Sequence, residues 1–206
     1  MPNPDTADTT HTALLELNST LREVIDAVRR STAPEDALSQ ATVHLRDAAR
    51  LLAPHAHAGP HFQGALGGDR PADPQVMRDP VRAFPYSPVI GRWNPIAPPI
   101  EFRVEAGRIE CSHVFGATHA GPPGAVHGGV VAMVFDEMLG SVNIVNDVGA
   151  YTGTLTIRYH IPTPLGTPIR MQARVRETKG RKVFSEGKMW HGGMLTAEAE
   201  GIFIRP

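Results

Sequence analysis

Two His-Gly-Gly tripeptides occur in the chain, and the first has a setting suited to chemistry. Residues 127–129 follow a Gly/Pro-rich loop and open a predicted helix. Glycines at a helix start let a ligand approach free backbone N–H groups, and the helix dipole favours negative charge there. Those are the properties of an oxyanion hole, which stabilises charge developing on a carbonyl oxygen. Taken alone, however, the tripeptide favours a plain loop-to-helix junction.

A carboxylate further along the same predicted helix adds a second chemical group. Asp136 shares a helical face with Gly129 and Asn143, each seven residues away. A helix wrapped by a sheet should be buried nearly all round, and an unpartnered buried carboxylate costs roughly several kcal/mol. We therefore expect Asp136 either at a seam between subunits or in a site. Glu137, rotated by about a third of a turn, is a competing carboxylate that spacing alone does not exclude.

Other residues with chemical potential have plainer interpretations. The second tripeptide, residues 191–193, lies between two predicted strands, where Gly-Gly favours a two-residue hairpin turn. Cys111 lies in a strand pattern and is expected in the core rather than as a nucleophile. The histidines of the following set lack Cys or carboxylate partners at ligand spacing, so we expect no metal site: His55, His57 and His61.

The elements that must position these groups follow from the hydrophobic periodicity. Two short strands flank Ala106 and Gly107, and a long helix is predicted from Gly128 to about Asn146. Four further strands, joined by short turns, occupy the rest of the chain: about 151–161, 168–177, 179–190 and 194–206. This order predicts an α+β fold in which an antiparallel sheet packs against one long helix.

The first half of the chain has a different texture. Apolar residues at alternating spacings of three and four predict an antiparallel helical pair over about residues 11–53: Leu14, Leu17, Leu21, Val24 and Val28, then Leu38, Ala41, Leu45, Ala48 and Leu52. Two such helices cannot close a core alone, so they must pack on the rest of the chain or on a second copy. We divide the chain into a helical hairpin (1–53), a Pro/Gly-rich connecting segment (54–100) and a sheet–helix domain (101–206).

Composition excludes several classes of function. The net charge is −1 and no basic stripe is interleaved with aromatic residues, so nucleic acid is not an expected partner. No apolar run suggests a membrane span, and the first residues lack the pattern of a secretory signal. The single cysteine is consistent with a reducing compartment, so we expect a cytoplasmic protein. The chain also lacks a Gly-x-Ser-x-Gly elbow, a His-Glu-x-x-His motif and a P-loop.

The stretch "GPPGAVHGGVVAMVFDEMLG" resembles the PaaI-like branch of the hotdog-fold acyl-CoA thioesterases. The motif of that family is His-Gly-Gly with an acidic residue nine positions after the histidine, matched here by His127, Gly128, Gly129 and Asp136. Downstream, "YTGTLTIRYHIPTP" resembles the strand that carries a catalytic threonine, here Thr152, and "TKGRKVFSEG" resembles a hairpin with Gly-Arg-Lys. The resemblance covers about residues 84–206.

The resemblance implies a hotdog fold, an antiparallel sheet wrapped around a long helix, here preceded by the helical pair. It also implies a homodimer or homotetramer with sites between subunits. The implied reaction is hydrolysis of medium- to long-chain acyl-CoA to free acid and CoA, with CoA as part of the substrate and no cofactor.

The resemblance also implies roles for individual residues. Backbone N–H groups of Gly128 and Gly129 would bind the thioester oxygen, and Asp136 would act as general base or as nucleophile. Thr152, from the partner subunit, would orient water or the carboxylate. His127 would shape the loop or hydrogen-bond near the thioester, and capping of local backbone is an equal alternative for it. A basic pair after Gly180 would hold the CoA phosphates, although such pairs are common on solvated hairpins: Arg181 and Lys182.

Three alternatives remain open at this point. A hotdog hydratase or dehydratase would need a well-separated Asp/His pair in a longer polar loop, which the sequence lacks. A non-catalytic acyl-CoA or fatty-acyl binding protein would keep the fold and bind ligand without releasing thiol. In the binding protein the helical pair would serve as an arm that binds a partner. The third alternative gives the helical pair only a scaffolding role, in which it covers the sheet or joins dimers.

Overall fold

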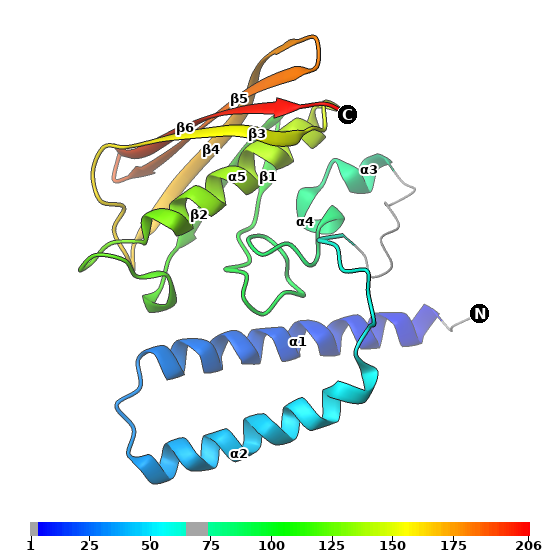
Figure 1. The fold of residues 1–206 in the computed structure, drawn as a ribbon, viewed down its shortest axis with the longest axis vertical. Coiled ribbons are helices and arrows are strands. Elements are labelled where there is room, and N and C mark those ends of the chain that lie inside the picture. Colours follow the sequence, from blue (N-terminus) through cyan, green and yellow to red (C-terminus); the bar gives the residue numbers. More distant parts are fainter. Residues whose placement is uncertain (1–3, 65–73) are drawn as a thin grey trace.

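The computed structural model describes residues 4–64 and 74–206, and its C-terminal half is an antiparallel sheet curved around one long helix (Figure 1). The sheet has six strands in the order β1-β2-β4-β5-β6-β3. The elements are β1 (Arg103–Glu105), β2 (Arg108–Val114), α5 (Gly128–Val145), β3 (Tyr151–Tyr159), β4 (Pro168–Lys179), β5 (Lys182–His191) and β6 (Met194–Ile204). The predicted α+β hotdog architecture is confirmed. Because β3 is the last strand in the order, one of its hydrogen-bonding edges has no partner strand within the described residues.

Two tight turns follow the expected glycine positions. Ala106 and Gly107 join β1 to β2 with positive φ angles of 47° and 73°. Gly192 and Gly193 join β5 to β6 with φ angles of 53° and 86°, between the paired residues His191 and Met194. Two consecutive positive φ angles match the twist of a hairpin. The second His-Gly-Gly tripeptide is therefore a turn, as predicted.

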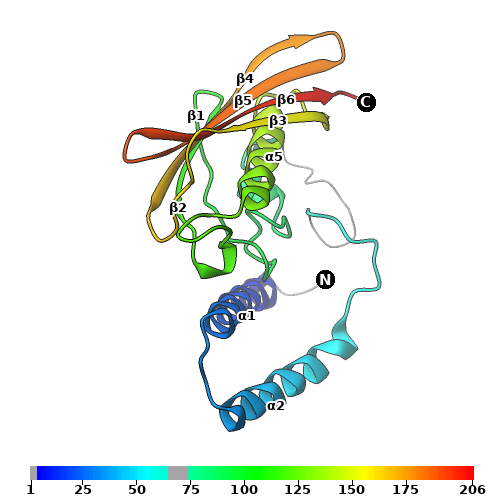
Figure 2. The ribbon, with the colours of Figure 1, turned by 60° about the vertical axis from the view of Figure 1, so that its left-hand side comes forward.

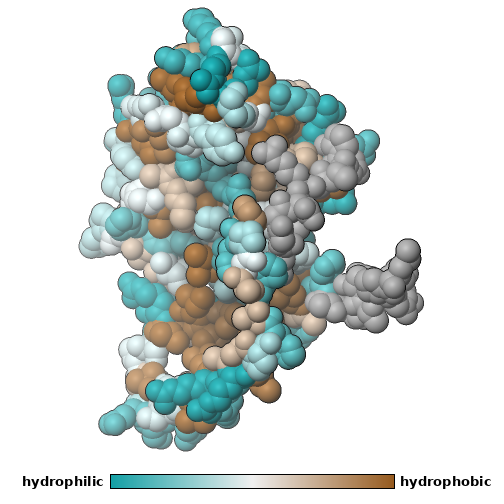
Figure 3. All heavy atoms as spheres, turned by 45° about the vertical axis from the view of Figure 1, so that its right-hand side comes forward, coloured by the Kyte–Doolittle hydropathy of each residue, from teal (hydrophilic) through white to brown (hydrophobic). Residues whose placement is uncertain are grey.

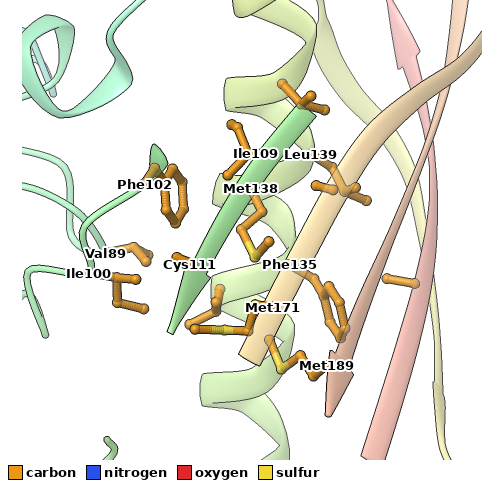
Figure 4. Close-up of a cluster of buried hydrophobic side chains, with 14 of the residues drawn as sticks. Val89, Ile100, Phe102, Ile109, Cys111, Phe135, Met138, Leu139, Met171 and Met189 are labelled. Carbon is orange, nitrogen blue, oxygen red and sulfur yellow. The ribbon is translucent and has the colours of Figure 1, made fainter. Parts of the chain in front are cut away.

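The core lies between α5 and the concave face of the sheet (Figure 4). Phe135, Met138 and Leu139 of α5 are fully buried there. Gly187 of β5 faces the helix, and a Cβ atom at this position would lie 3.1 Å from the Phe135 ring. A glycine there lets the helix approach the sheet closely enough to exclude water from the apolar side chains.

The Pro/Gly-rich connecting segment is mostly irregular, with four short helical turns in and after it: η1 (Ala53–His55), α3 (Pro74–Met77), α4 (Pro80–Ala83) and η2 (Ala117–His119). Residues 65–73 of this segment lie outside the described residues. Its later part packs on the sheet–helix domain, because Val89, Ile90 and Ile100 are buried in the same core as α5. The division of the chain into three domains stays a prediction.

Both predicted N-terminal helices are present, and they run antiparallel (Figures 1 and 2). α1 (Pro4–Arg29) docks on the connecting segment: the His11 and Trp93 ring centroids are 4.8 Å apart, and Arg22 Nη1 donates a 3.1 Å hydrogen bond to the carbonyl oxygen of Asn94. α2 (Glu35–Leu52) has no buried residue. Among the described helices and strands, its substantial contacts are with η1, which continues it.

The statement that no apolar run is long enough to cross a membrane does not hold for α5. By length and composition alone, this helix is long and apolar enough to do so. The apolar residues of α5 are also those of a core helix, because one side of α5 packs against the sheet and nine of its residues are buried.

Candidate active site

Asp136 lies on the exposed side of α5, where its carboxylate meets the start of β3. The Thr152 hydroxyl donates a hydrogen bond of 2.9 Å to Asp136 Oδ1 within the same chain. Gly129 and Met133, the preceding residues on this side of the helix, are also exposed. The predicted polar face does not extend to Asn143, which is fully buried and accepts a hydrogen bond from Ser185. The exposed strip therefore leaves Asp136 open to a ligand or a second subunit.

Glu137 points in a different direction, toward the connecting segment. Burial, offset in part by a hydrogen bond from Ser87 and reinforced by the charge of Asp136, raises the pKa of Glu137 to about 7. Ser87 is fully buried, and its Oγ accepts hydrogen bonds from the backbone N–H groups of Val89 (3.1 Å) and Ile90 (3.2 Å). Glu137 is thus tied to the segment that closes the core.

The first His-Gly-Gly tripeptide forms the N-terminus of α5. His127 is the N-cap, and its Nδ1 accepts a 3.0 Å hydrogen bond from the Gly129 N–H. An Nδ1 that accepts is unprotonated, so a neutral ring carries its proton on Nε2. The Gly128 N–H has no partner within the described part of the chain. In this conformation Gly128 supplies the free amide, whereas the Gly129 amide is already used.

Tyr159 completes this end of the helix, and no pattern in the sequence pointed to it. Its hydroxyl donates a 2.8 Å hydrogen bond to the carbonyl oxygen of Gly128. In the sequence, Tyr159 is an ordinary alternating residue near the end of a strand, and only the crossing of β3 over the start of α5 brings it to the tripeptide. Ser87 was missed for a similar reason, because it lies in an irregular segment with no periodicity.

A largely apolar pocket of about 300 Å³ opens beside Gly128. It lies between the loop before α5 and the end of β3, and its wall includes Val126, Val131, Tyr159, Ile161 and Pro162. Apolar pockets with a few polar groups at one edge are the usual form of small-molecule sites. This pocket can therefore take an apolar portion of a ligand whose polar end reaches the start of the helix.

The basic pair lies on the β4–β5 hairpin, at the end of the sheet where β3 begins. Lys182 pairs with Ile204 of β6, which in turn pairs with Tyr151, next to Thr152. The Arg181 side chain donates a 3.0 Å hydrogen bond through Nε to the carbonyl oxygen of Arg205. Arg181 is thus partly committed to holding the C-terminal strand.

Cys111 and the histidines of the connecting segment were not expected to take part in chemistry. Cys111 is buried, and burial together with the charge of Glu110 raises the pKa of its thiol to about 12, which makes it a poor nucleophile. The histidines of the connecting segment are exposed: His55, His57 and His61. Across the described ranges 4–64 and 74–206, no group of three or more His, Cys, Asp or Glu residues is arranged to hold a metal ion.

Comparison with known proteins points to one superfamily. The sequence model of the thioesterase superfamily matches residues 123–198, a stretch that includes Asp136 and Thr152. Acyl-coenzyme A thioesterase THEM4 of Xenopus laevis is 34% identical over 100 residues, which is 48% of this chain and 45% of that protein. THEM4 of Mus musculus is 38% identical over 87 residues, 41% of this chain and 37% of that protein. The matched stretch spans less than half the length of these curated relatives.

One solved structure extends the likeness to most of the chain, the N-terminal helices included. That structure, described as a thioesterase superfamily protein, has a TM-score of 0.79 and 27% identity, and covers 93% of this chain and 90% of that chain. Thioesterase superfamily member 2 of zebra fish has a TM-score of 0.53 and 20% identity, over 64% of this chain and 94% of that chain, and is similar in fold alone.

Proposed function

We propose that this protein is an enzyme that hydrolyses acyl-CoA thioesters to a free acid and CoA, because residues 123–198 match the sequence model of the thioesterase superfamily. The observation that carries the proposal is the hydrogen bond from Thr152 to the exposed carboxylate of Asp136. A carboxylate held by one oxygen keeps its second oxygen for a water molecule or for the substrate. The preference for medium- to long-chain acyl groups rests on the sequence resemblance.

The proposed chemistry uses groups at the start and the middle of α5. The Gly128 N–H donates to the thioester oxygen, where the helix dipole also favours the developing negative charge. Asp136 either removes a proton from water as water attacks the carbonyl carbon, or attacks that carbon directly, and then water hydrolyses the resulting anhydride. In both routes the C–S bond breaks and the thiolate of CoA leaves with a proton.

His127 and Tyr159 act in this scheme as positioning residues. The His127 ring holds the Gly129 amide, and the Tyr159 hydroxyl holds the Gly128 carbonyl oxygen, so the peptide unit that follows the Gly128 N–H is fixed on both sides. This changes the assignment of the two amides: Gly128 is the oxyanion donor, and Gly129 has the supporting part. His127 is exposed, so the Nε2–H of its neutral ring is a further donor at the start of the helix.

The distance along α5 favours a site shared by two subunits. Asp136 comes eight residues after Gly128, which corresponds to about 12 Å along the helix axis. The two groups are too far apart to contact one carbonyl within a single chain. A second copy that pairs along the free edge of β3 would cover the exposed strip of α5 and bring its own tripeptide near this Asp136.

The same hydrogen bond supports a different proposal for Thr152. The resemblance implied that Thr152 comes from the partner subunit, whereas the 2.9 Å bond within one chain favours Thr152 acting on Asp136 of its own chain. β3 follows α5 directly and folds back beside it, so the two residues meet without a partner. In the proposed dimer the group that crosses the interface is the tripeptide, and the Asp136–Thr152 pair is provided as a unit.

The CoA end of the substrate is assigned to the hairpin that carries Arg181 and Lys182. Replacing both by Gln is expected to raise the KM for acyl-CoA about tenfold, because two cationic contacts to phosphate are lost, with kcat little changed. Lys188 on β5 provides a matched control away from the hairpin. Steady-state kinetics of Arg181→Gln/Lys182→Gln and Lys188→Gln would check this, and an unchanged KM in the double variant would remove the hairpin from the site.

The proposed function is tested by a thiol-release assay on the purified protein, over acyl-CoA substrates from acetyl to palmitoyl. Binding of acyl-CoA without thiol release would overturn hydrolysis in favour of a binding protein. The shared site is tested by co-producing two inactive variants, Asp136→Asn and Gly128→Pro. Proline at the first helical position replaces the N–H by a ring carbon, and its Cβ would lie at an ordinary contact distance of 3.7 Å from the Tyr159 ring. His127, with ψ of 133°, accepts a following proline.

The two arrangements of the site give opposite results in this mixture. If each site combines groups from two chains, a mixed dimer keeps one intact site of two and recovers about half the wild-type activity. If each site lies within one chain, every site in the mixed dimer is broken and no activity returns. We further propose that the protein is cytoplasmic and that it assembles beyond the dimer.

A further inference from the structure

α2 is an amphipathic helix whose apolar side has no cover within the described residues. Its apolar residues remain exposed, including Leu38 at 47%, Leu45 at 40% and Leu52 at 49% of their surface. Figure 3 shows brown, hydrophobic side chains among teal, hydrophilic ones in the lower part of the molecule, where the N-terminal helices lie. Most helical stability in proteins comes from packing of an amphipathic face, and α2 has no buried residue. We therefore expect the apolar side of α2 to pack against a partner.

The residue pattern of α2 specifies what kind of partner fits. Leu38, Leu45 and Leu52 recur at intervals of seven, and Ala41 and Ala48 recur at the same interval between them. An apolar seam with strict spacings of three and four has the 3.5-residue period of a coiled coil, narrower than the stripe of a helix packed on a globular core. The seam alternates one large and one small residue.

We propose that α2 pairs with α2 of a second copy of this chain, in antiparallel orientation. In an antiparallel coiled coil, the two kinds of seam position face each other across the interface. In one register this places Leu38 against Ala48 of the second copy and Ala41 against its Leu45, and the two-fold axis repeats both contacts. Every layer then contains one leucine and one alanine, so the helices pack closely without overfilling the seam.

The charges of α2 favour the same orientation. Its first turn is acidic, with Glu35 and Asp36, and its last turn carries Arg50. Antiparallel pairing brings the acidic end of each helix to the basic end of the other and opposes the two helix dipoles, whereas parallel pairing places like ends together. α1 differs from α2 in that one of its sides contacts the connecting segment, as Arg22 does, although Ile25 and Val28 of α1 are also exposed.

This surface is separate from the proposed dimer along β3. α2 and β3 lie at opposite ends of the molecule in both ribbon views (Figures 1 and 2). Pairing through α2 therefore leaves the β3 edge free. If pairing along β3 forms a dimer, pairing through α2 joins two such dimers into a tetramer.

The test is the mass of the full-length protein in solution, measured by analytical ultracentrifugation over a range of concentrations. Leu38→Glu/Leu45→Glu is expected to halve the mass. Val43→Glu is the matched control, since Val43 is 53% exposed but lies on the opposite side of α2, and its mass should be unchanged. A second variant, Leu38→Ala/Leu45→Ala, keeps helix propensity and should raise the dissociation constant at least tenfold.

The possible results separate α2 pairing from other roles of the helix and from the β3 dimer. A fall from tetramer to dimer supports both contacts, and a fall from dimer to monomer supports α2 pairing without the β3 dimer. An unchanged mass in the seam variants overturns the proposal. An unchanged mass with a lower melting temperature would mean that α2 packs within its own chain, and equal loss in the Val43 variant would indicate non-specific association.

Orientation is tested with single cysteines placed in the seam. Ala41→Cys and Leu45→Cys are each expected to stay uncrosslinked alone and to form a disulfide-linked pair when co-produced and oxidised, because residue 41 faces residue 45 of the other copy. Cross-linking of either variant by itself would indicate parallel pairing and overturn the antiparallel register. The native Cys111 is buried, so the unmodified protein should not cross-link and serves as the control.

Discussion

Asp136 and Glu137 are neighbours on one helix, yet their surroundings are opposite. Asp136 is exposed and accepts a hydrogen bond from Thr152 of β3. Glu137 is packed against the connecting segment, where burial raises its pKa to about 7. A step of one residue turns a helix by about 100°, which here is enough to move a carboxylate from a ligand-accessible strip to a closed interface. Adjacent acidic residues in a motif therefore need not share a role.

The largest expected difference between the two carboxylates is in turnover. Asp136→Asn should lower kcat/KM for acyl-CoA by about a thousandfold, because the group that activates water or attacks the thioester is lost. Glu137→Gln should keep activity within a few-fold of wild type. Thiol release measured for both variants, with circular dichroism to verify folding, checks this contrast. A folded Asp136→Asn variant with full activity, or loss of activity only in Glu137→Gln, would reverse the assignment.

The hydroxyl of Thr152 provides the next largest effect on the exposed side. Thr152→Val keeps the shape of the side chain but removes the hydrogen bond to Asp136, and kcat should fall about 10- to 100-fold, since hydrogen bonds to charged groups contribute about 1.5–3 kcal/mol. Thr152→Ser retains the hydroxyl and should recover most of the activity. If the valine and serine variants were equally active, Thr152 would have no part in orienting the carboxylate.

For Glu137, which packs against the connecting segment, the expected effect is a pH dependence of the free energy of unfolding. The pKa of Glu137 is raised to about 7 from 4.5, so the folded chain keeps a proton that the unfolded chain releases. The contribution of Glu137 to stability is therefore full below pH 4.5 and is lost as pH rises through 7, by roughly 3 kcal/mol. Glu137→Gln cannot ionise and should become more stable relative to wild type as pH rises from 5 to 8.

The difference between wild type and Glu137→Gln isolates this effect from other titrating groups. Burial, reinforced by nearby His119, lowers the pKa of His113 to about 4, so His113 favours the folded state increasingly as pH rises from 4 to 6.5. That trend is common to both proteins and cancels in the difference of their melting temperatures. A difference that stays constant from pH 5 to 8 would mean that Glu137 titrates as an exposed carboxyl group does.

The smallest expected effect concerns Ser87, which donates a hydrogen bond to Glu137. Ser87→Ala removes the acceptor of the Val89 and Ile90 N–H groups and the donor to Glu137, and should lower the free energy of unfolding by about 1–2 kcal/mol. Activity should be retained, because none of these groups faces the exposed strip. Urea unfolding measures the change, and Ser112→Ala, at an exposed serine of β2, is the matched control. A large loss of activity in Ser87→Ala would connect the connecting segment to the site.

The sequence determined the elements and the motif. Alternation and 3.6-residue periodicity depend on which residues can be buried, so the helices, the strands and both glycine turns were predictable from local pattern. The motif from His127 to Asp136 was recognisable because helix spacing determines which residues share a face. The heptad pattern of α2 is likewise visible in the sequence alone, since a seven-residue apolar repeat indicates a helical partner.

Only the tertiary structure decided which groups meet. Thr152 and Tyr159 both lie on β3, and nothing local to that strand reveals that one bonds to Asp136 and the other to Gly128. The separation of Asp136 from Glu137 likewise depends on Ser87, about fifty residues earlier in the chain. Contacts between distant segments arise from packing of the whole core, which no short-range pattern encodes, and in this protein those contacts distinguish the proposed catalytic carboxylate from its neighbour.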